Sequence, residues 1–351
     1  MRASARRARH LGMLLAALVA LAPLASAAAG ERVRLDDGQL QVGIAPELGG
    51  RVVHLSLPGR PNLLKVGAAL DEVPPPQPAA DGVDIPYMGH VLWIGPQSRW
   101  WLDQDVNPAR REAAAPWPPD PWLAYGRNRV VERSDHALAL EGVDSPVSGL
   151  RASQRYRLSG QAPATMTLEA EATNVRDRDV RGDLWFNTRL PAASRVFVPV
   201  ASPGDARLRA DEDAFFAGPV AWWEDGLYSL QATPPPEGRG GRRGKIFIAP
   251  SAGWIAGFNA GQLLLIRFDR QPDEAIDPEH GQVEVYQQWH HDDPDSGLLE
   301  LEVHAPMRTL APGASMAAGE IWTVFPYAGP DTLDAQRAAL LQALDSLGLA
   351  L

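Results

Sequence analysis

The chain of 351 residues contains no cysteine, and Lys65 and Lys245 are its only lysines. Without cysteine there is no disulfide, thiol nucleophile, iron–sulfur cluster or cysteine-rich zinc site. The fold must therefore be held by its hydrophobic core, and a chain of this length can bury a sufficiently large one. Because nearly all positive charge is arginine, we attribute the scarcity of lysine to GC-rich coding.

Sequence signatures of nucleotide binding are also missing. No P-loop, dinucleotide-binding glycine motif or G-x-S-x-G elbow opens a helix, which argues against nucleotide-dependent and α/β-hydrolase chemistry. We expect no cofactor. The formal net charge is −10, and removal of the four arginines before residue 10 would lower it to −14. So acidic a chain is not expected to bind nucleic acid or anionic membranes.

The N-terminal segment has the pattern of an export signal. A basic stretch with four arginines precedes the apolar run Leu11–Leu24, and Ala25–Ala27 supply small residues for cleavage. The apolar run is too short to span a bilayer comfortably. We therefore predict a signal peptide at residues 1–27, no stable membrane insertion after cleavage, and a periplasmic or secreted protein.

Segments with strand-like alternation follow one another from Arg32 to residue 326. About fifteen or more strands in one chain imply large stacked antiparallel sheets. The prediction is an all-β domain at residues 28–329, followed by a short C-terminal helix at 330–351 that Asp331 caps and that packs on the domain. Two proline-rich segments, 72–87 and 111–122, form ordered loops that either rim a site or are decoration.

One predicted strand, "RGDLWFNTRL" at residues 181–190, has an unusual face. Alternation places an ordinary core row on one side, made of Leu184, Phe186, Thr188 and Leu190. The opposite row contains an acid, an indole, an amide and a guanidinium, namely Asp183, Trp185, Asn187 and Arg189. Such a row either faces water or lines a binding site.

Three other segments carry polar rows. They are "LLELEVHAP" with Glu300, Glu302 and His304, "VEVYQQWHH" with Tyr286, and "GHVLWIGPQSRWW" with His90, Trp93 and Arg99. If these strands neighbour residues 181–190, their polar faces line one groove suited to binding a polyol and to proton transfer. The competing interpretation is that each face is simply solvated.

The segment "HHDDPD" at residues 290–295 contains metal-ligand residue types. Adjacent histidines on a strand point in opposite directions, so they seldom bind one ion. The aspartates are equally typical of an acidic turn. We expect no metal site.

The order of motifs resembles a family of bacterial domains in the galactose mutarotase-like (aldose 1-epimerase-like) superfamily. The resemblance rests on "VGIAPELGGRVVHLSLPGRPNLL", "GHVLWIGPQSRWW", "LWFNTRL" and "LLELEVHAPMRTLAPGASMAAGEIWTV". It implies a β-supersandwich with a carbohydrate-sized cleft on one sheet.

The resemblance also implies roles for individual residues. Leu301-Glu302 before Pro306 is similar to the late-strand glutamate that takes the anomeric proton, so Glu302 is the candidate base, with Glu300 second. Ser98-Arg99 resembles an early Asn-Arg pair. The family's catalytic histidine is replaced by Asp183, which donates a proton poorly unless burial raises its pKa.

Three functions follow from these patterns. The first is an exported carbohydrate-binding protein that, if it is an enzyme, acts by proton transfer at the anomeric carbon, as in an aldose 1-epimerase-like isomerase. The second is a non-catalytic glycan-binding or envelope accessory protein. The third is a polysaccharide lyase or glycosidase-like enzyme.

Overall fold

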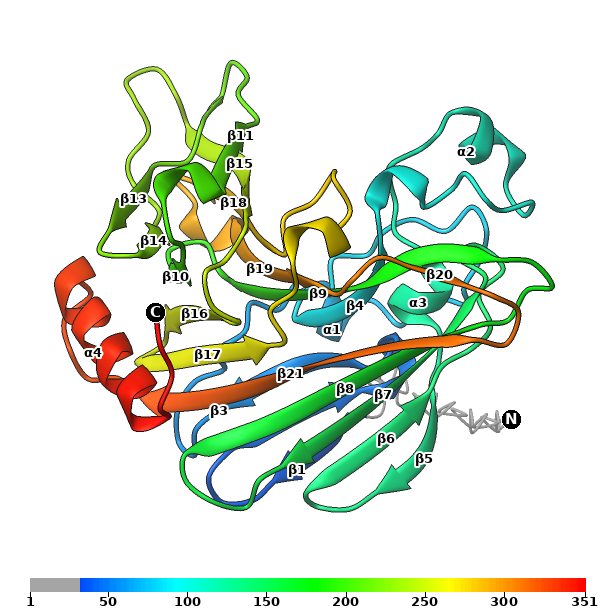
Figure 1. Ribbon diagram of the computed structural model, residues 1–351, viewed down its shortest axis with the longest axis horizontal. Coiled ribbons are helices and arrows are strands. Elements are labelled where there is room, and N and C mark those ends of the chain that lie inside the picture. Colours follow the sequence, from blue (N-terminus) through cyan, green and yellow to red (C-terminus); the bar gives the residue numbers. More distant parts are fainter. Residues whose placement is uncertain (1–31) are drawn as a thin grey trace, which may run out of the picture.

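The structure is a computed structural model that describes residues 32–351, and two large sheets dominate it (Figure 1). The predicted signal peptide at residues 1–27 lies outside the described residues. Within residues 32–351, no helix has the length and apolar character needed to cross a membrane. The strand content confirms the all-β prediction.

The first sheet has eleven strands. Nine of them run, in spatial order, as β1 (Val33–Asp36), β2 (Gln41–Ala45), β3 (Arg51–Ser56), β4 (His90–Gly95), β9 (Val180–Pro191), β19 (Leu298–His304), β18 (Val283–His290), β15 (Gly241–Ile248) and β11 (Ala206–Ala210). Two short strands lie off this path, β12 (Phe216–Ala217) beside β15 and β20 (Arg308–Leu310) beside β9.

The second sheet has ten strands. Their spatial order is β13 (Ala221–Glu224), β14 (Leu227–Leu230), β10 (Arg195–Pro199), β16 (Trp254–Asn259), β17 (Gln262–Phe268), β21 (Ser315–Pro326), β8 (Ala164–Asn174), β7 (Leu150–Leu158), β6 (Ala137–Glu141) and β5 (Arg129–Arg133). The outermost strand β5 is exposed along its whole length.

Helices are few and mostly short. The α-helices are α1 (Ala69–Glu72), α2 (Pro108–Glu112), α3 (Pro121–Tyr125) and α4 (Leu333–Ser346). The 3-10 helices are η1 (Pro46–Leu48), η2 (Gln97–Arg99), η3 (Pro203–Asp205), η4 (Asp273–Ala275) and η5 (Pro294–Ser296).

Apolar side chains from both sheets form one contiguous core. Leu184 and Phe186 of β9 belong to the same buried cluster as Leu168 and Trp322 of the second sheet. This arrangement follows from the alternation of β9, which directs every second residue toward the opposite sheet. The other row of β9 therefore points away from the core.

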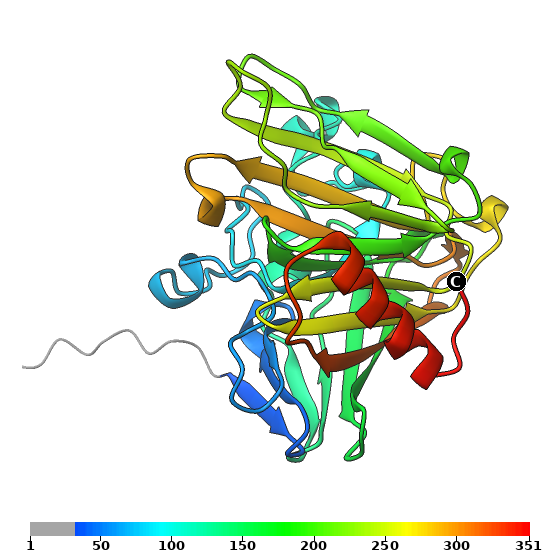
Figure 2. The same ribbon diagram turned by 90° about the vertical axis from the view of Figure 1, so that its left-hand side faces the viewer.

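Helix α4 crosses the outer side of the second sheet (Figure 2). Its Leu340 and Leu344 belong to a buried cluster with Phe197 and Trp254. The N-cap is Thr332, whose Oγ1 accepts the amide hydrogen of Ala335 at 3.4 Å, so the prediction that Asp331 caps the helix is wrong. The observed cap is thus one residue after the predicted one, and α4 lies within the predicted range 330–351.

Candidate functional site

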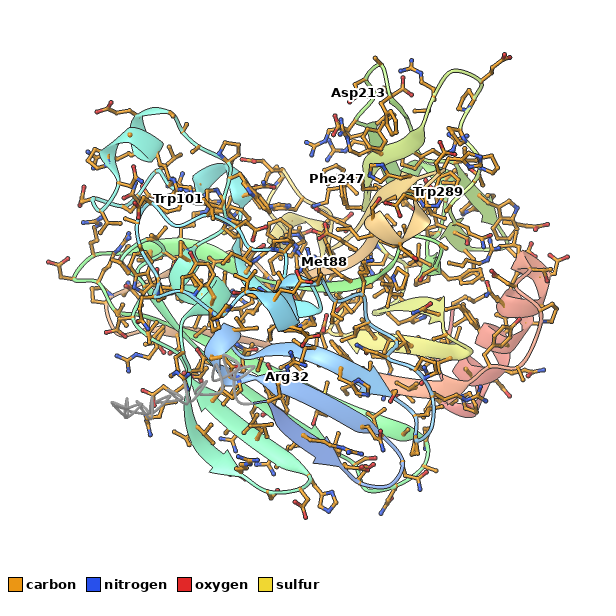
Figure 3. All side chains as sticks on the ribbon, turned by 180° about the vertical axis from the view of Figure 1, so that it is seen from behind. Arg32, Met88, Trp101, Asp213, Phe247 and Trp289 are labelled. Carbon is orange, nitrogen blue, oxygen red and sulfur yellow. The ribbon has the colours of Figure 1, made fainter. Side chains whose placement is uncertain are left out.

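A pocket of about 600 Å³ lies on the outer face of the first sheet. Strands β9, β15, β18 and β19 contribute to its lining, together with residues 84–86, Met88 and Trp117 from two of the loops. Figure 3 shows Trp101 and Asp213 in two raised regions on opposite sides of Met88. Of these three residues, Met88 lines the pocket.

The polar row of β9 lies at and beneath this pocket. Asp183 and Asn187 are 0% exposed, Trp185 is 1% exposed and Arg189 is 7% exposed. Trp185 and Arg189 line the pocket, whereas Asp183 and Asn187 do not. The row predicted from alternation is therefore present, and it is buried instead of facing bulk water.

Arg189 and Glu300 form an ion pair in the pocket. They are cross-strand partners on β9 and β19, and Arg189 Nε donates to Glu300 Oε1 at 2.8 Å. The guanidinium carbon also lies 5.0 Å from the ring centroid of Trp93. Stacking and pairing together hold the guanidinium in one orientation.

Several aromatic rings surround the pocket. Trp93 lies edge-on to Trp185, with ring centroids 4.9 Å apart, and edge-on to Trp117 at 6.2 Å. The Trp117 side is open, since this residue is 47% exposed. Tyr286 lines the pocket and donates its hydroxyl to Gln288 Oε1 at 3.2 Å. The 111–122 loop thus reaches the rim through Trp117, while Trp122 packs against the neighbouring tryptophan cluster.

Glu302, the candidate base, lies beneath the pocket and is 0% exposed. Its Oε2 accepts the Trp185 indole N–H at 2.8 Å and the Lys245 ammonium at 2.9 Å. Burial raises the pKa of Glu302 to about 7, although the charge of Lys245 opposes that shift. Trp185 and Lys245 line the pocket and Glu302 does not, so these two side chains separate the carboxylate from it.

A second buried group adjoins Glu302. Glu284 Oε2 lies 2.6 Å from Lys245 Nζ, and Glu284 Oε1 lies 2.7 Å from His280 Nδ1. His304 Nδ1 lies 3.1 Å from Asp183 Oδ2. Burial alone lowers the pKa of His304, but the charges of Asp183 and Glu284 outweigh it and raise that pKa to about 9.

The pKa of Glu284 is shifted by its positively charged neighbours. Burial by itself would raise its pKa, but Lys245 and His304 hold the pKa well below its usual range. Asp183 is bonded to His304 beneath the Trp185 ring. Its carboxyl group is therefore not placed to donate a proton to a molecule in the pocket.

The expectation that His90 lies on the polar face is wrong. His90 pairs with Thr188, and its Nδ1 lies 2.9 Å from Thr188 Oγ1 on the core side of the sheet. Its ring contacts Trp322 of the second sheet at 4.9 Å. His90 and Trp93 lie three positions apart on β4, so their side chains point to opposite faces of the sheet. Burial lowers the pKa of His90 to about 3, which makes it a neutral core residue.

The expectation that Arg99 joins the groove is also wrong. Strand β4 ends at Gly95, and Arg99 lies in η2, where its Nη2 is 2.5 Å from Asp103 Oδ2. It lines a separate pocket of about 290 Å³. His304 likewise lies outside the main pocket, because the ring of Trp185 stacks on it at 4.8 Å.

Lys245, His280 and Glu284 are central to the site but are not among the predicted site residues, although Glu284 lies in the same strand row as Tyr286. The rarity of lysine could have singled out Lys245, which alternation in "GKIFIAP" places opposite the buried Ile246. His280 precedes Glu284 by four residues in a loop, and no periodicity marks it. Their positions depend on strand pairing, which brings β15, β18 and β19 side by side.

Comparison with known proteins agrees with the fold. Residues 30–325 match the family model "Domain of unknown function (DUF4380)". No curated protein matches the chain.

Solved structures with the same fold share little sequence with the chain. A candidate aldose 1-epimerase from Klebsiella pneumoniae is 13% identical, with 89% of this chain and 81% of that chain covered and a TM-score of 0.52. A galactose mutarotase-like protein from Lactobacillus casei is 13% identical, with 84% and 100% covered and a TM-score of 0.51. A protein from Synechocystis is 13% identical, with 85% and 96% covered and a TM-score of 0.51. These similarities confirm the predicted fold.

Proposed function

We propose that this chain, which belongs to the DUF4380 family, is an exported carbohydrate-binding protein that holds a sugar in the pocket above Trp185. The observation that carries the proposal is the combination of indole faces with an oriented ion pair around a pocket of about 600 Å³. Indoles pack on the C–H faces of sugar rings, while charged and amide groups bind hydroxyls. Export is proposed from residues 1–27 and implies a mature N-terminus at Ala28.

The pocket supplies both kinds of contact. Trp117 offers a partly exposed indole at the rim, and Trp93 lies deeper. The Arg189–Glu300 pair presents donors and acceptors side by side, and their side chains are only 8% and 13% exposed. Because this pair is already in place, little side-chain entropy is lost when a hydroxyl binds to it.

The surroundings of Glu302 favour binding over anomeric proton transfer. A base must lie within hydrogen-bond reach of the proton it takes. The Oε2 of Glu302 is already bonded to Trp185 and Lys245, and its Oε1 is buried without a hydrogen-bond partner. The likeness to aldose 1-epimerases therefore supports a sugar-sized site, and we assign it a binding role.

The test is calorimetric titration of the full chain with a panel of mono- and oligosaccharides. Trp117→Ala should weaken binding of the sugars that bind by roughly tenfold, equivalent to about 1.4 kcal/mol. Trp223→Ala is the matched control, because Trp223 lies on β13, is 39% exposed and does not line the pocket. Equal losses in both variants, or no binding across the panel, would refute the proposal.

A second measurement separates binding from catalysis. NMR exchange spectroscopy on α-glucose and α-galactose should show interconversion no faster than in buffer. If interconversion is faster than in buffer and this acceleration disappears in Glu302→Gln, the protein is an isomerase and the proposed binding role is wrong. Release of reducing or unsaturated ends from polysaccharides would indicate a cleaving enzyme.

A further inference from the structure

Two imidazoles and one carboxylate oxygen converge beneath Trp185. Glu284 Oε1 lies 2.7 Å from His280 Nδ1 and 3.7 Å from His304 Nε2. One donor atom from each of these residues lies within 4.8 Å of the others. The 3.7 Å separation is close to that of two ligands that share one ion at about 2.0–2.2 Å from each, and the remaining separations need only small side-chain adjustments to reach it.

His304 is oriented toward this point from behind. Its Nδ1 is bonded to Asp183 Oδ2 at 3.1 Å, which leaves Nε2 directed at Glu284. His304 is 0% exposed, and its Nε2 has no hydrogen-bond partner. Metal-binding histidines commonly have this arrangement: a carboxylate bonded to one ring nitrogen holds the ring in orientation, and the other nitrogen is left to bind the metal.

Lys245 does not compete for the same oxygen. Its ammonium contacts Glu284 Oε2, whereas both imidazoles face Oε1. Three buried carboxylates lie in this network, on Asp183, Glu284 and Glu302. A divalent cation at this point would place further positive charge beside these carboxylates.

We propose that His280, Glu284 and His304 bind one divalent transition-metal ion of the Zn²⁺ type. Imidazole with carboxylate suits Zn²⁺ and its neighbours in the first transition row, whereas Ca²⁺ and Mg²⁺ prefer oxygen ligands alone. Three protein ligands leave a fourth position for water or another ligand.

One of the three ligands also borders a pocket other than the sugar pocket. His280 lines a second pocket, also of about 600 Å³, with residues such as Asp277 and Met307. On the sugar side, the Trp185 ring lies 4.8 Å from His304 and 5.5 Å from His280. The metal site therefore does not depend on the proposed function and is tested without any sugar.

The test uses the untagged full chain after chelator treatment, titrated calorimetrically with Zn²⁺. We expect one Zn²⁺ per chain and a higher unfolding temperature with the ion bound. His280→Gln should lower the affinity at least tenfold. Asp183→Asn, which removes no ligand, should lower it by about 10–100-fold.

The matched control is His291→Gln, in the exposed segment that also contains histidines and aspartates. It should leave the affinity unchanged, as should Trp117→Ala. No Zn²⁺ binding, an unaltered affinity in His280→Gln, or an equal loss in His291→Gln would overturn the proposal. If His280→Gln does not fold, the visible spectrum of the Co²⁺-loaded unmodified chain decides, since absence of tetrahedral d–d bands would refute the site.

Discussion

Two buried glutamates show how differently charge is accommodated on the outer face of the first sheet and in the interior between the two sheets. Glu302, on the outer side, is 0% exposed, and Glu320, between the sheets, is 2% exposed. Each accepts an indole N–H at 2.8 Å, from Trp185 and Trp322 respectively. Burial raises the pKa of Glu302 to about 7 and that of Glu320 to about 8.

The difference lies in their neighbours. Glu302 shares Lys245 with Glu284, so opposite charge is built into its surroundings. Burial and the Trp322 bond are the influences that set the pKa of Glu320, which therefore stays protonated at neutral pH. The outer side of the sheet accommodates charges by pairing them, and the interior accommodates a carboxyl group by keeping it neutral.

Removing the lysine should produce the largest effect. Lys245→Met leaves Glu284 and Glu302 without their cation, and we expect a loss of about 3–5 kcal/mol in the free energy of unfolding, measured by denaturant titration. Lys65→Met is the matched control, because Lys65 is the only other lysine and its ammonium contacts a backbone carbonyl. Similar losses in both variants would show that the carboxylates do not depend on Lys245.

The isolated glutamate should make stability depend on pH. In the unfolded chain Glu320 ionises near its ordinary value of 4.5, whereas the folded protein keeps the proton until about pH 8. Its contribution is therefore complete below about pH 4.5 and is lost as pH rises toward 8. Between about pH 5 and 7, unmodified protein should lose about 2–3 kcal/mol relative to Glu320→Gln.

The control for this measurement is Glu169→Gln, on the outer side of β8, where the side chain is 71% exposed. Denaturant titrations across the pH range should show the same fall for this variant as for the unmodified protein. A parallel fall in Glu320→Gln would mean that another group causes it.

The smallest expected effect compares the two indole donors. Trp185→Phe removes a hydrogen bond to a carboxylate paired with Lys245, and Trp322→Phe removes one to a neutral acid. Bonds to charged groups contribute about 1.5–3 kcal/mol and neutral ones about 0.5–1.5 kcal/mol. Trp185→Phe should therefore be more destabilising by roughly 1 kcal/mol in thermal or denaturant unfolding. An equal or reversed order would remove the distinction between the two sites.

Local alternation predicted much of the fold and part of the site. The two rows of β9 were correct because residue parity alone decides which side of a strand a residue occupies. The same rule explains why the prediction for His90 was wrong. His90 and Trp93 have even and odd residue numbers on one strand, so their side chains lie on opposite faces. Arg99 failed because β4 ends at Gly95, beyond which alternation has no meaning.

The rest of the site depends on contacts that no local pattern contains. Lys245 reaches Glu302 because β18 lies between β15 and β19, an order that joins distant parts of the chain. His280 comes from a loop, so its approach to His304 depends on the path of residues 276–282. The burial of Glu302 likewise could not be predicted, because it depends on where the Trp185 ring lies.

The exposed outermost strand β5 is relevant to self-association of this protein at high concentration. Its unpaired edge offers backbone donors and acceptors to any passing extended segment. Arg129, Glu132 and Arg133 occupy that edge; Arg129 pairs with Glu141 of the adjoining strand β6, and Glu132 pairs with Arg155 of β7. A second molecule that extended the sheet there would have to desolvate these charges. The charged side chains of this edge strand, none of which lines the pocket, are thus expected to oppose edge-to-edge association.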